Sequence, residues 1–127
     1  MIAVLRALII GGSPDFRRFV RAILETEGFE CVEALNNTDA LNFASESGID
    51  LIVADGDTPR PGDHDLLSIV ANGVFGVHAP PLILSCRQSH LKRRFPANGF
   101  GPRPISIVKP FEPRELTEAL AAALPDP

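Results

Sequence analysis

The stretch LIVADGDTP, residues 51–59, is an apolar run that gives way within a few positions to acid, glycine and proline. A short apolar run bounded by turn residues is typical of a strand that is covered on both faces. We place this strand at Ile49–Ala54 and a loop at Asp55–Gly62. The strand therefore presents Asp55 at its carboxyl end, and Asp57 follows two positions later.

Similar apolar runs lie on both sides of this stretch, and most are followed by a segment with helical spacing of its apolar residues. Four further strands are predicted, at Leu5–Ile10, Phe29–Ala34, Pro81–Ser85 and Ile105–Val108. Helices are predicted from Ser13-Pro14 to about Glu27, from Asn37 or Thr38 to Ala44, from Asp63 to about Asn72, and at Glu112–Leu124. This alternation predicts an α/β fold, with a five-stranded parallel sheet and helices on both faces.

Composition limits the class of protein. The length of 127 residues favours a single domain spanning 1–127. Twelve basic against 16 acidic residues give a net charge of −4, which argues against nucleic acid as the main partner. No run approaches the roughly 18 apolar residues of a membrane helix. The two cysteines, Cys31 and Cys86, are too few for a disulfide scaffold, so we expect a cytoplasmic protein.

In a parallel sheet of this kind, ligands bind beyond the carboxyl ends of the strands. The residues found there are two glycines, an acid, a hydroxyl and a base: Gly11, Gly12, Asp55, Ser85 and Lys109. A carboxylate can attack phosphorus to give an acyl phosphate, and a lysine with a hydroxyl can stabilise the phosphoryl oxygens. This set has the residue types that phosphoryl chemistry at Asp55 requires.

Three segments together resemble the receiver domain of two-component response regulators: LIVADGDTP (51–59), LILS (82–85) and IVKPF (107–111). The resemblance extends over Leu5–Leu124 and implies the flavodoxin-like (βα)5 fold. It also implies that Asp55 is the phosphoacceptor, that Ser85 contacts the phosphoryl group, and that Lys109 pairs with it.

The sequence departs from this family at the metal site. The family carries an acidic pair after the first strand to hold Mg²⁺, whereas this chain has Gly11 and Gly12, which offer no side-chain ligand. We therefore expect Mg²⁺ binding to be weak or absent, with no other cofactor. Asp55 remains as a possible ligand, and Asp57 or Asp15 could help to hold the ion. Without the metal, phosphotransfer is expected to be much slower.

Two further departures concern signalling. The family has an aromatic residue or histidine three positions before the lysine, where this chain has Ser106, which is too small to act as that switch. The stretch from Arg87 to Pro104 is basic, contains no acid, and is either a solvated loop or a surface for an acidic partner. Its basic residues are Arg87, Lys92, Arg93, Arg94 and Arg103. The resemblance implies a fourth helix in this stretch, which would be atypical because it is short, about Gln88–Arg94, and followed by a long loop.

These observations favour a stand-alone, bacterial receiver-like signalling module of a two-component or phosphorelay pathway, and not an enzyme. The resemblance implies a protein partner, either a histidine kinase or a downstream signalling protein. It also implies possible homodimers through the fourth helix, fifth strand and fifth helix.

Three alternatives stay open. The first is a competent phosphoacceptor that uses Asp57 or Asp15 to help hold Mg²⁺. The second is a flavodoxin-like module that binds a nucleotide or another small molecule at the start of the first helix. The third is an aspartyl-nucleophile phosphatase, because Asp55-Gly56-Asp57 is similar to the haloacid-dehalogenase motif.

Overall fold

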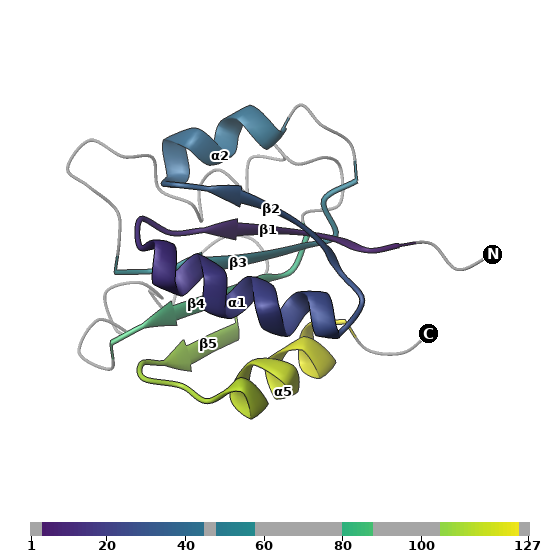
Figure 1. The fold of residues 1–127 in the computed structure, drawn as a ribbon, viewed down its shortest axis with the longest axis vertical. Coiled ribbons are helices and arrows are strands. Elements are labelled where there is room, and N and C mark those ends of the chain that lie inside the picture. The colour runs from purple at the N-terminus through teal and green to yellow at the C-terminus, as the bar shows by residue number, and fades with distance from the viewer. Residues whose placement is uncertain (1–3, 45–47, 58–79, 88–104, 125–127) are drawn as a thin grey trace, which may run out of the picture.

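The computed structural model describes residues 4–44, 48–57, 80–87 and 105–124. The strands are β1 (Arg6–Ile10), β2 (Glu30–Ala34), β3 (Leu51–Asp55), β4 (Leu82–Cys86) and β5 (Ile105–Val108). The helices are α1 (Pro14–Thr26), α2 (Asn37–Ala44) and α5 (Pro113–Ala123). All five strands are parallel in the order β2-β1-β3-β4-β5, which confirms the predicted fold class (Figure 1).

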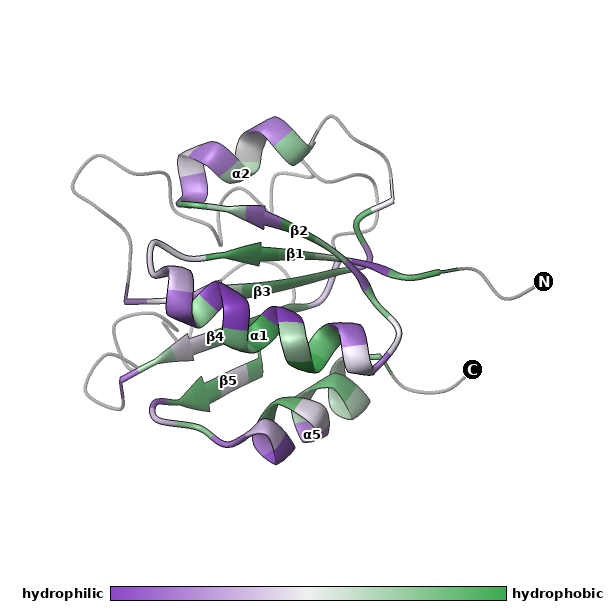
Figure 2. Cartoon of the chain, viewed as in Figure 1, coloured by the Kyte–Doolittle hydropathy of each residue, from purple (hydrophilic) through white to green (hydrophobic). Residues whose placement is uncertain are grey.

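Residues on both faces of the central strands β1, β3 and β4 are buried. Alternate residues of each strand point to opposite sides of the sheet. One face packs under α1 and α5 and the other meets α2 (Figure 1). Within β1, for example, Ala7 and Ile9 belong to the first layer while Leu8 and Ile10 belong to the second. Figure 2 shows β1 and β3 as mainly hydrophobic, whereas α1 mixes hydrophobic and hydrophilic residues. Burial of the apolar side chains of these strands stabilises the sheet.

The bounds of α1 follow from its end residues. The Ser13 hydroxyl oxygen accepts the backbone N–H of Phe16 at 3.3 Å, and Pro14 occupies the first turn, where its missing N–H costs nothing. Gly28 has a φ of +93°, a conformation that glycine adopts readily after a helix. The predicted start and end of this helix are confirmed.

The third and fourth strands are each shifted slightly from their predicted bounds. β3 starts at Leu51 because Asp50 precedes the ladder and its carboxylate accepts the Arg6 N–H at 2.9 Å. β3 includes Asp55, which pairs in register with Ser85 of β4, and β4 runs on to Cys86. The helices predicted at 63–72 and 88–94 lie outside the described residues. None of the helices in the described part of the chain is both long and apolar enough to cross a membrane.

Candidate functional site

The predicted chemical residues meet at one edge of the sheet. Gly11 follows β1, Asp55 ends β3, Ser85 lies near the end of β4, and Lys109 follows β5. The strands are parallel and adjacent, so their carboxyl ends share this edge. The alternation that places Ile9 in the layer under α1 and α5 also places these four residues on that side of the sheet.

Asp55 and Lys109 form a direct ion pair. The Lys109 Nζ atom donates to the Asp55 Oδ1 atom at 2.5 Å, and the Asp55 side chain is 8% exposed while that of Lys109 is 27% exposed. The Lys109 backbone is fixed by its N–H, which donates to the Cys86 carbonyl oxygen at 3.0 Å. Coulomb attraction is stronger in such a poorly hydrated position than at the open surface. The pair therefore ties the end of β3 to the end of β5.

Asp57 joins the same cluster. Its carboxylate Oδ2 atom lies 3.2 Å from Lys109 Nζ, and its backbone N–H donates to Asp55 Oδ1 at 3.0 Å. The same carboxylate accepts the backbone N–H of Arg87 at 3.1 Å and lies 3.9 Å from the Arg87 guanidinium Nε atom. Two carboxylates thus face two basic side chains, and the cluster is electrically balanced.

Ser85 is fully buried beside Asp55. Its carbonyl oxygen accepts the Gly56 N–H at 2.6 Å, which holds the turn after β3 against β4. Within the described part of the chain its hydroxyl oxygen has no hydrogen-bond partner. A buried hydroxyl without a partner is unfavourable unless a water or a bound group occupies the adjoining position.

The loop between β1 and α1 has a different character. Gly11 is buried, and a Cβ atom added to it would lie 2.8 Å from Phe16 Cδ1 and 3.3 Å from Asp55 Cβ. The Phe16 ring therefore lies beside the position that a Gly11 side chain would take. The Lys109 Nζ atom is 5.6 Å from the centre of this ring, within the range of a cation–π contact. An aromatic ring fills the side of the site where the family resemblance requires acids.

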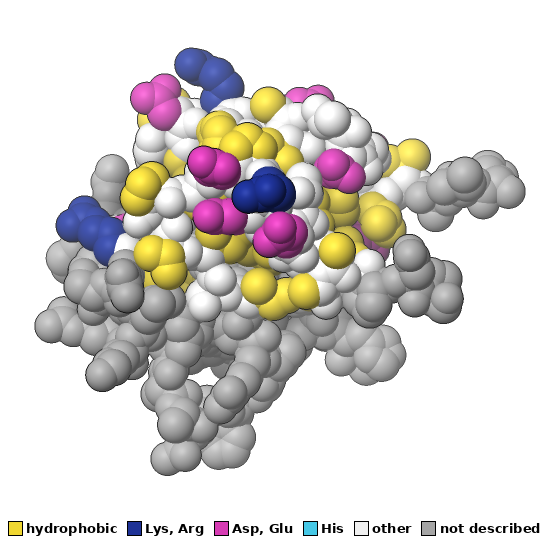
Figure 3. Space-filling model, turned by 90° about the horizontal axis from the view of Figure 1, so that it is seen from below, with side chains coloured by type: hydrophobic (Ala, Val, Ile, Leu, Met, Phe, Trp, Pro, Cys, Tyr) yellow, Lys and Arg dark blue, Asp and Glu magenta, His cyan; other side chains and the backbone are white. Residues whose placement is uncertain are grey.

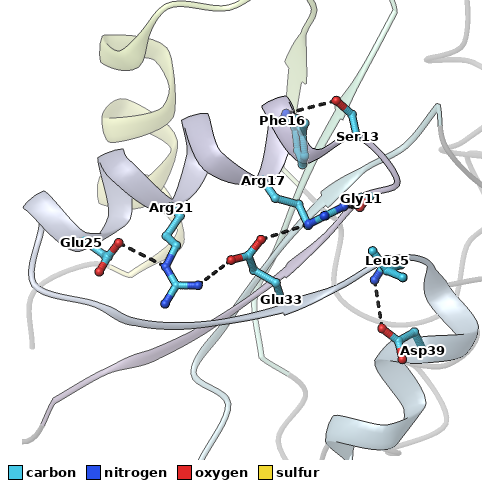
Figure 4. A network of polar contacts seen from close by, with 9 residues as sticks. All are labelled: Gly11, Ser13, Phe16, Arg17, Arg21, Glu25, Glu33, Leu35 and Asp39. Atoms are coloured by element: carbon cyan, nitrogen blue, oxygen red, sulfur yellow. Dashed lines mark hydrogen bonds and ion pairs between the residues drawn. The ribbon is translucent and has the colours of Figure 1, made fainter.

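An arginine from α1 fixes this loop (Figure 4). The Arg17 Nη1 atom donates to the Gly11 carbonyl oxygen at 2.6 Å, and its Nε donates to Glu33 Oε1 of β2 at 3.0 Å. The Gly11 N–H donates to the Ala34 carbonyl oxygen at 3.0 Å. Arg21 completes the network by contacting Glu33 and Glu25, and its hydrogen bond to Glu33 raises the pKa of Arg21 above its ordinary value. With both backbone groups of Gly11 engaged and Ser13 capping α1, this loop gives no support to the small-molecule alternative.

The remaining predicted residues have different outcomes. Asp15 is 95% exposed and pairs with Arg18 at 3.8 Å, so the structure gives no support to a metal ligand at this position. Ser106 is exposed on β5, and Arg87 is exposed while pairing with Asp57. The other basic residues of the predicted partner surface lie outside the described residues: Lys92, Arg93, Arg94 and Arg103.

Sequence reasoning missed the roles of Phe16 and Arg17. The apolar spacing of the first helix indicates no role for Phe16 at the site, although its position in the first turn after Gly12 is a usable signal. Residues in the first turn of a helix that follows a strand lie near the carboxyl edge of a parallel sheet. For Arg17, no pattern in the sequence indicates that its side chain reaches back to a glycine carbonyl.

Solved structures resemble the chain over nearly its full length. The chemotaxis protein CheY4 of Vibrio cholerae is 22% identical with a TM-score of 0.77, covering 96% of this chain and 100% of its own. The signal receiver domain of an HD domain-containing protein from Pseudomonas fluorescens Pf-5 is 21% identical with a TM-score of 0.78, covering 96% and 95%. A response regulator receiver protein from Sinorhizobium medicae WSM419 is 20% identical with a TM-score of 0.78, covering 98% and 97%.

The fold is that of receiver domains. No protein-family model matches the chain. The receiver fold agrees with the predicted flavodoxin-like sheet and with the position of Asp55 at the end of β3. Asp55 thus ends the third strand, whereas the nucleophile of haloacid-dehalogenase-like phosphatases ends the first strand, so the position of Asp55 gives no support to the phosphatase alternative.

The receiver resemblance implies Mg²⁺, and the residues at this edge do not fit the family's metal site. Mg²⁺ binds carboxylates and waters in nearly ideal octahedral geometry. The carboxylates of Asp55 and Asp57 are both engaged by Lys109, and the Phe16 ring lies beside Gly11 in place of a further acid. Among the described residues, no three acidic, histidine or cysteine side chains are grouped so that they could hold a metal ion.

Proposed function

We propose that this chain is an atypical receiver-like signalling module of a two-component or phosphorelay pathway. Asp55 occupies the phosphoacceptor position, and Mg²⁺-dependent phosphorylation there is weak or absent. The module acts through contacts with a protein partner, either a histidine kinase or a downstream signalling protein, and not as an enzyme. The proposal combines the receiver fold with the residues that surround Asp55.

One observation carries the proposal, namely the packing of Phe16 against Gly11. Phosphoryl transfer needs its developing negative charge neutralised, and a metal ion supplies much of that stabilisation in phosphoryl-transfer sites. An aromatic ring beside Asp55 offers no oxygen ligand to Mg²⁺. Lys109 is left as the nearest positive group to Asp55, at 2.5 Å. Lys109 alone is a poor substitute for a metal ion, since its charge is already opposed by two carboxylates.

The edge strand β5 and the neighbouring helix α5 form a candidate surface for a protein partner or a second copy of the chain. Ser106 and Val108 of β5 are exposed, although Val108 is apolar. The face shown in Figure 3 carries acidic side chains around a basic one. The exposed charged residues of and beside α5 are Glu112, Arg114, Glu115 and Glu118. A partner that binds here would complement a mainly acidic surface with the apolar side chain of Val108 beside it.

The test is phosphorylation of the intact chain by acetyl phosphate with Mg²⁺, followed by mass spectrometry. The proposal expects little or no phosphorylated protein, and no change in amide NMR shifts with beryllofluoride and Mg²⁺. The Asp55→Asn variant is the control for modification elsewhere. Phosphorylation of the wild type but not of Asp55→Asn would contradict the proposal.

The same experiment decides a second candidate, a competent receiver in which Asp57 helps to hold Mg²⁺. The hydrogen bond from the Asp57 backbone N–H to Asp55 Oδ1, at 3.0 Å, favours it, since this places a second acid beside Asp55. Under this candidate, Mg²⁺-dependent phosphorylation is substantial in the wild type and is lost in Asp57→Asn. It is retained in Asp15→Asn, which removes an exposed acid.

A further inference from the structure

Asp57 has an arrangement that the receiver resemblance does not account for. It lies beyond the end of β3, in a turn where an acidic side chain would ordinarily point to water. Only 8% of its side chain is exposed. Its carboxylate instead turns towards the ends of two other strands.

The groups that surround this carboxylate are donors. The backbone N–H of Arg87, directly after β4, points at both of its oxygens, at 3.1 and 3.4 Å. The Lys109 ammonium, directly after β5, is 3.2 Å away. A lysine and a backbone N–H converging at strand ends form a set of donors suited to binding an anion. In this chain the Asp57 carboxylate occupies the position of such an anion.

We propose that Asp57 is an internal anion that occupies Lys109 and the Arg87 N–H, so that the ends of β3, β4 and β5 are held together without a phosphoryl group. This inference rests on the proposed function, because it describes how the atypical site is regulated. Asp57 acts here as a positioning residue. The site is held in one arrangement by the chain itself, and an external anion has to compete with a tethered carboxylate.

Charge supports this assignment. Among the described residues, the charges of Asp55 and Asp57 oppose those of Lys109 and Arg87, so a phosphate or sulfate ion would meet basic groups that already have carboxylate partners. Tethering adds a second advantage. A carboxylate already in place loses little further entropy on binding, whereas a free ion loses its translational freedom. Removal of the Asp57 carboxylate should therefore convert the cluster into an anion site.

The test is a titration with inorganic phosphate, without Mg²⁺, followed by amide NMR of the intact chain. The wild type should show no saturable shift, whereas Asp57→Ala should show saturable shifts at Arg87 and Lys109. Asp15→Asn is the matched control, because it removes one negative charge from an exposed position, and it should behave as the wild type. Equal phosphate responses in the wild type and Asp57→Ala would overturn the inference.

Hydrogen exchange of the Arg87 amide gives an independent readout. In Asp57→Ala the Arg87 amide loses one hydrogen bond to a charged acceptor, and its exchange rate should rise by about tenfold or more. Asp57→Asn keeps an acceptor oxygen, so this amide should stay protected while Lys109 alone responds to phosphate. If Asp57→Ala does not fold, the comparison of Asp57→Asn with Asp15→Asn decides. An unchanged Arg87 exchange rate in Asp57→Ala would contradict the inference.

These outcomes are separable from the proposed function. If the wild type is phosphorylated with Mg²⁺ while phosphate still binds only after removal of the Asp57 carboxylate, the proposed function fails and the internal anion stands. If the wild type is not phosphorylated and the phosphate response is the same in the wild type and in Asp57→Ala, the internal-anion inference fails and the proposed function stands.

Discussion

The two halves of the site edge are built differently. In the half formed by β3, β4 and β5, Asp55, Asp57 and Lys109 bind one another, and the polar groups form a connected network. In the half formed by the loop after β1, Gly11 and Phe16 present backbone and an apolar ring. The contrast indicates that the phosphoacceptor position and the metal position of a receiver fold are separable. One position keeps its charged side chains while the other contributes only packing.

The largest expected effect comes from breaking the polar half. Lys109→Met leaves two poorly hydrated carboxylates facing each other without their shared base. We expect a loss of about 2–3 kcal/mol in the free energy of unfolding, below the usual cost for a fully buried pair because Lys109 keeps some exposure. Urea denaturation measures it. Adding Asp55→Asn to this variant should recover part of the loss, and no recovery would show that the carboxylates do not repel each other.

A smaller effect is expected from the apolar half. Gly11→Ala places a Cβ atom against the Phe16 ring, so we expect a loss of about 1–2 kcal/mol from overpacking. The same change made in a Phe16→Ala background should cost less, because the opposing ring is gone. A double-mutant cycle in urea measures the coupling. Gly12→Ala is the matched control, since Gly12 is exposed. Equal costs in the two backgrounds would mean that the ring does not occupy this space.

The link between α1 and the loop should contribute less again. Arg17→Ala removes the hydrogen bonds to the Gly11 carbonyl and to Glu33, and we expect a loss of about 1 kcal/mol in the free energy of unfolding. Arg18→Ala is the control because Arg18 is highly exposed, and it should change stability very little. Indistinguishable unfolding curves for the two variants would show that Arg17 does not anchor the loop.

The smallest effect concerns a residue outside both halves. Burial raises the pKa of the Cys31 thiol above its ordinary value of 9.0. The folded state then holds this proton more tightly than the unfolded state, so the stability contribution is complete below pH 9 and is lost as the pH rises through the folded pKa. Urea denaturation of the wild type and of Cys31→Ala at increasing pH above 9 tests this prediction. The free energy of unfolding of the variant should fall less with pH than that of the wild type. A matching fall in both would show that Cys31 is not responsible.

Much of the fold was predictable from sequence because it depends on local patterns. The apolar runs fixed the strands, and Ser13, Pro14 and Gly28 fixed the ends of α1. The convergence of Asp55, Ser85 and Lys109 followed from parallel strand order. The side-chain contacts did not follow, because whether Phe16 packs on Gly11 depends on where α1 lies over the sheet. The contact of Asp57 with Arg87 depends on the conformation of the turn after β3, and the turn residues predict a turn there without predicting its conformation.

The measurement that tests the central claim most directly is a Mg²⁺ titration of the isotope-labelled wild-type chain, with the amide signals of Asp55 and Asp57 followed by NMR. If the loop after β1 contributes only packing, these signals should not shift in a saturable way at low-millimolar Mg²⁺. Saturable shifts centred on Asp55 would contradict the account, since they would show that the site binds the ion without an acidic pair.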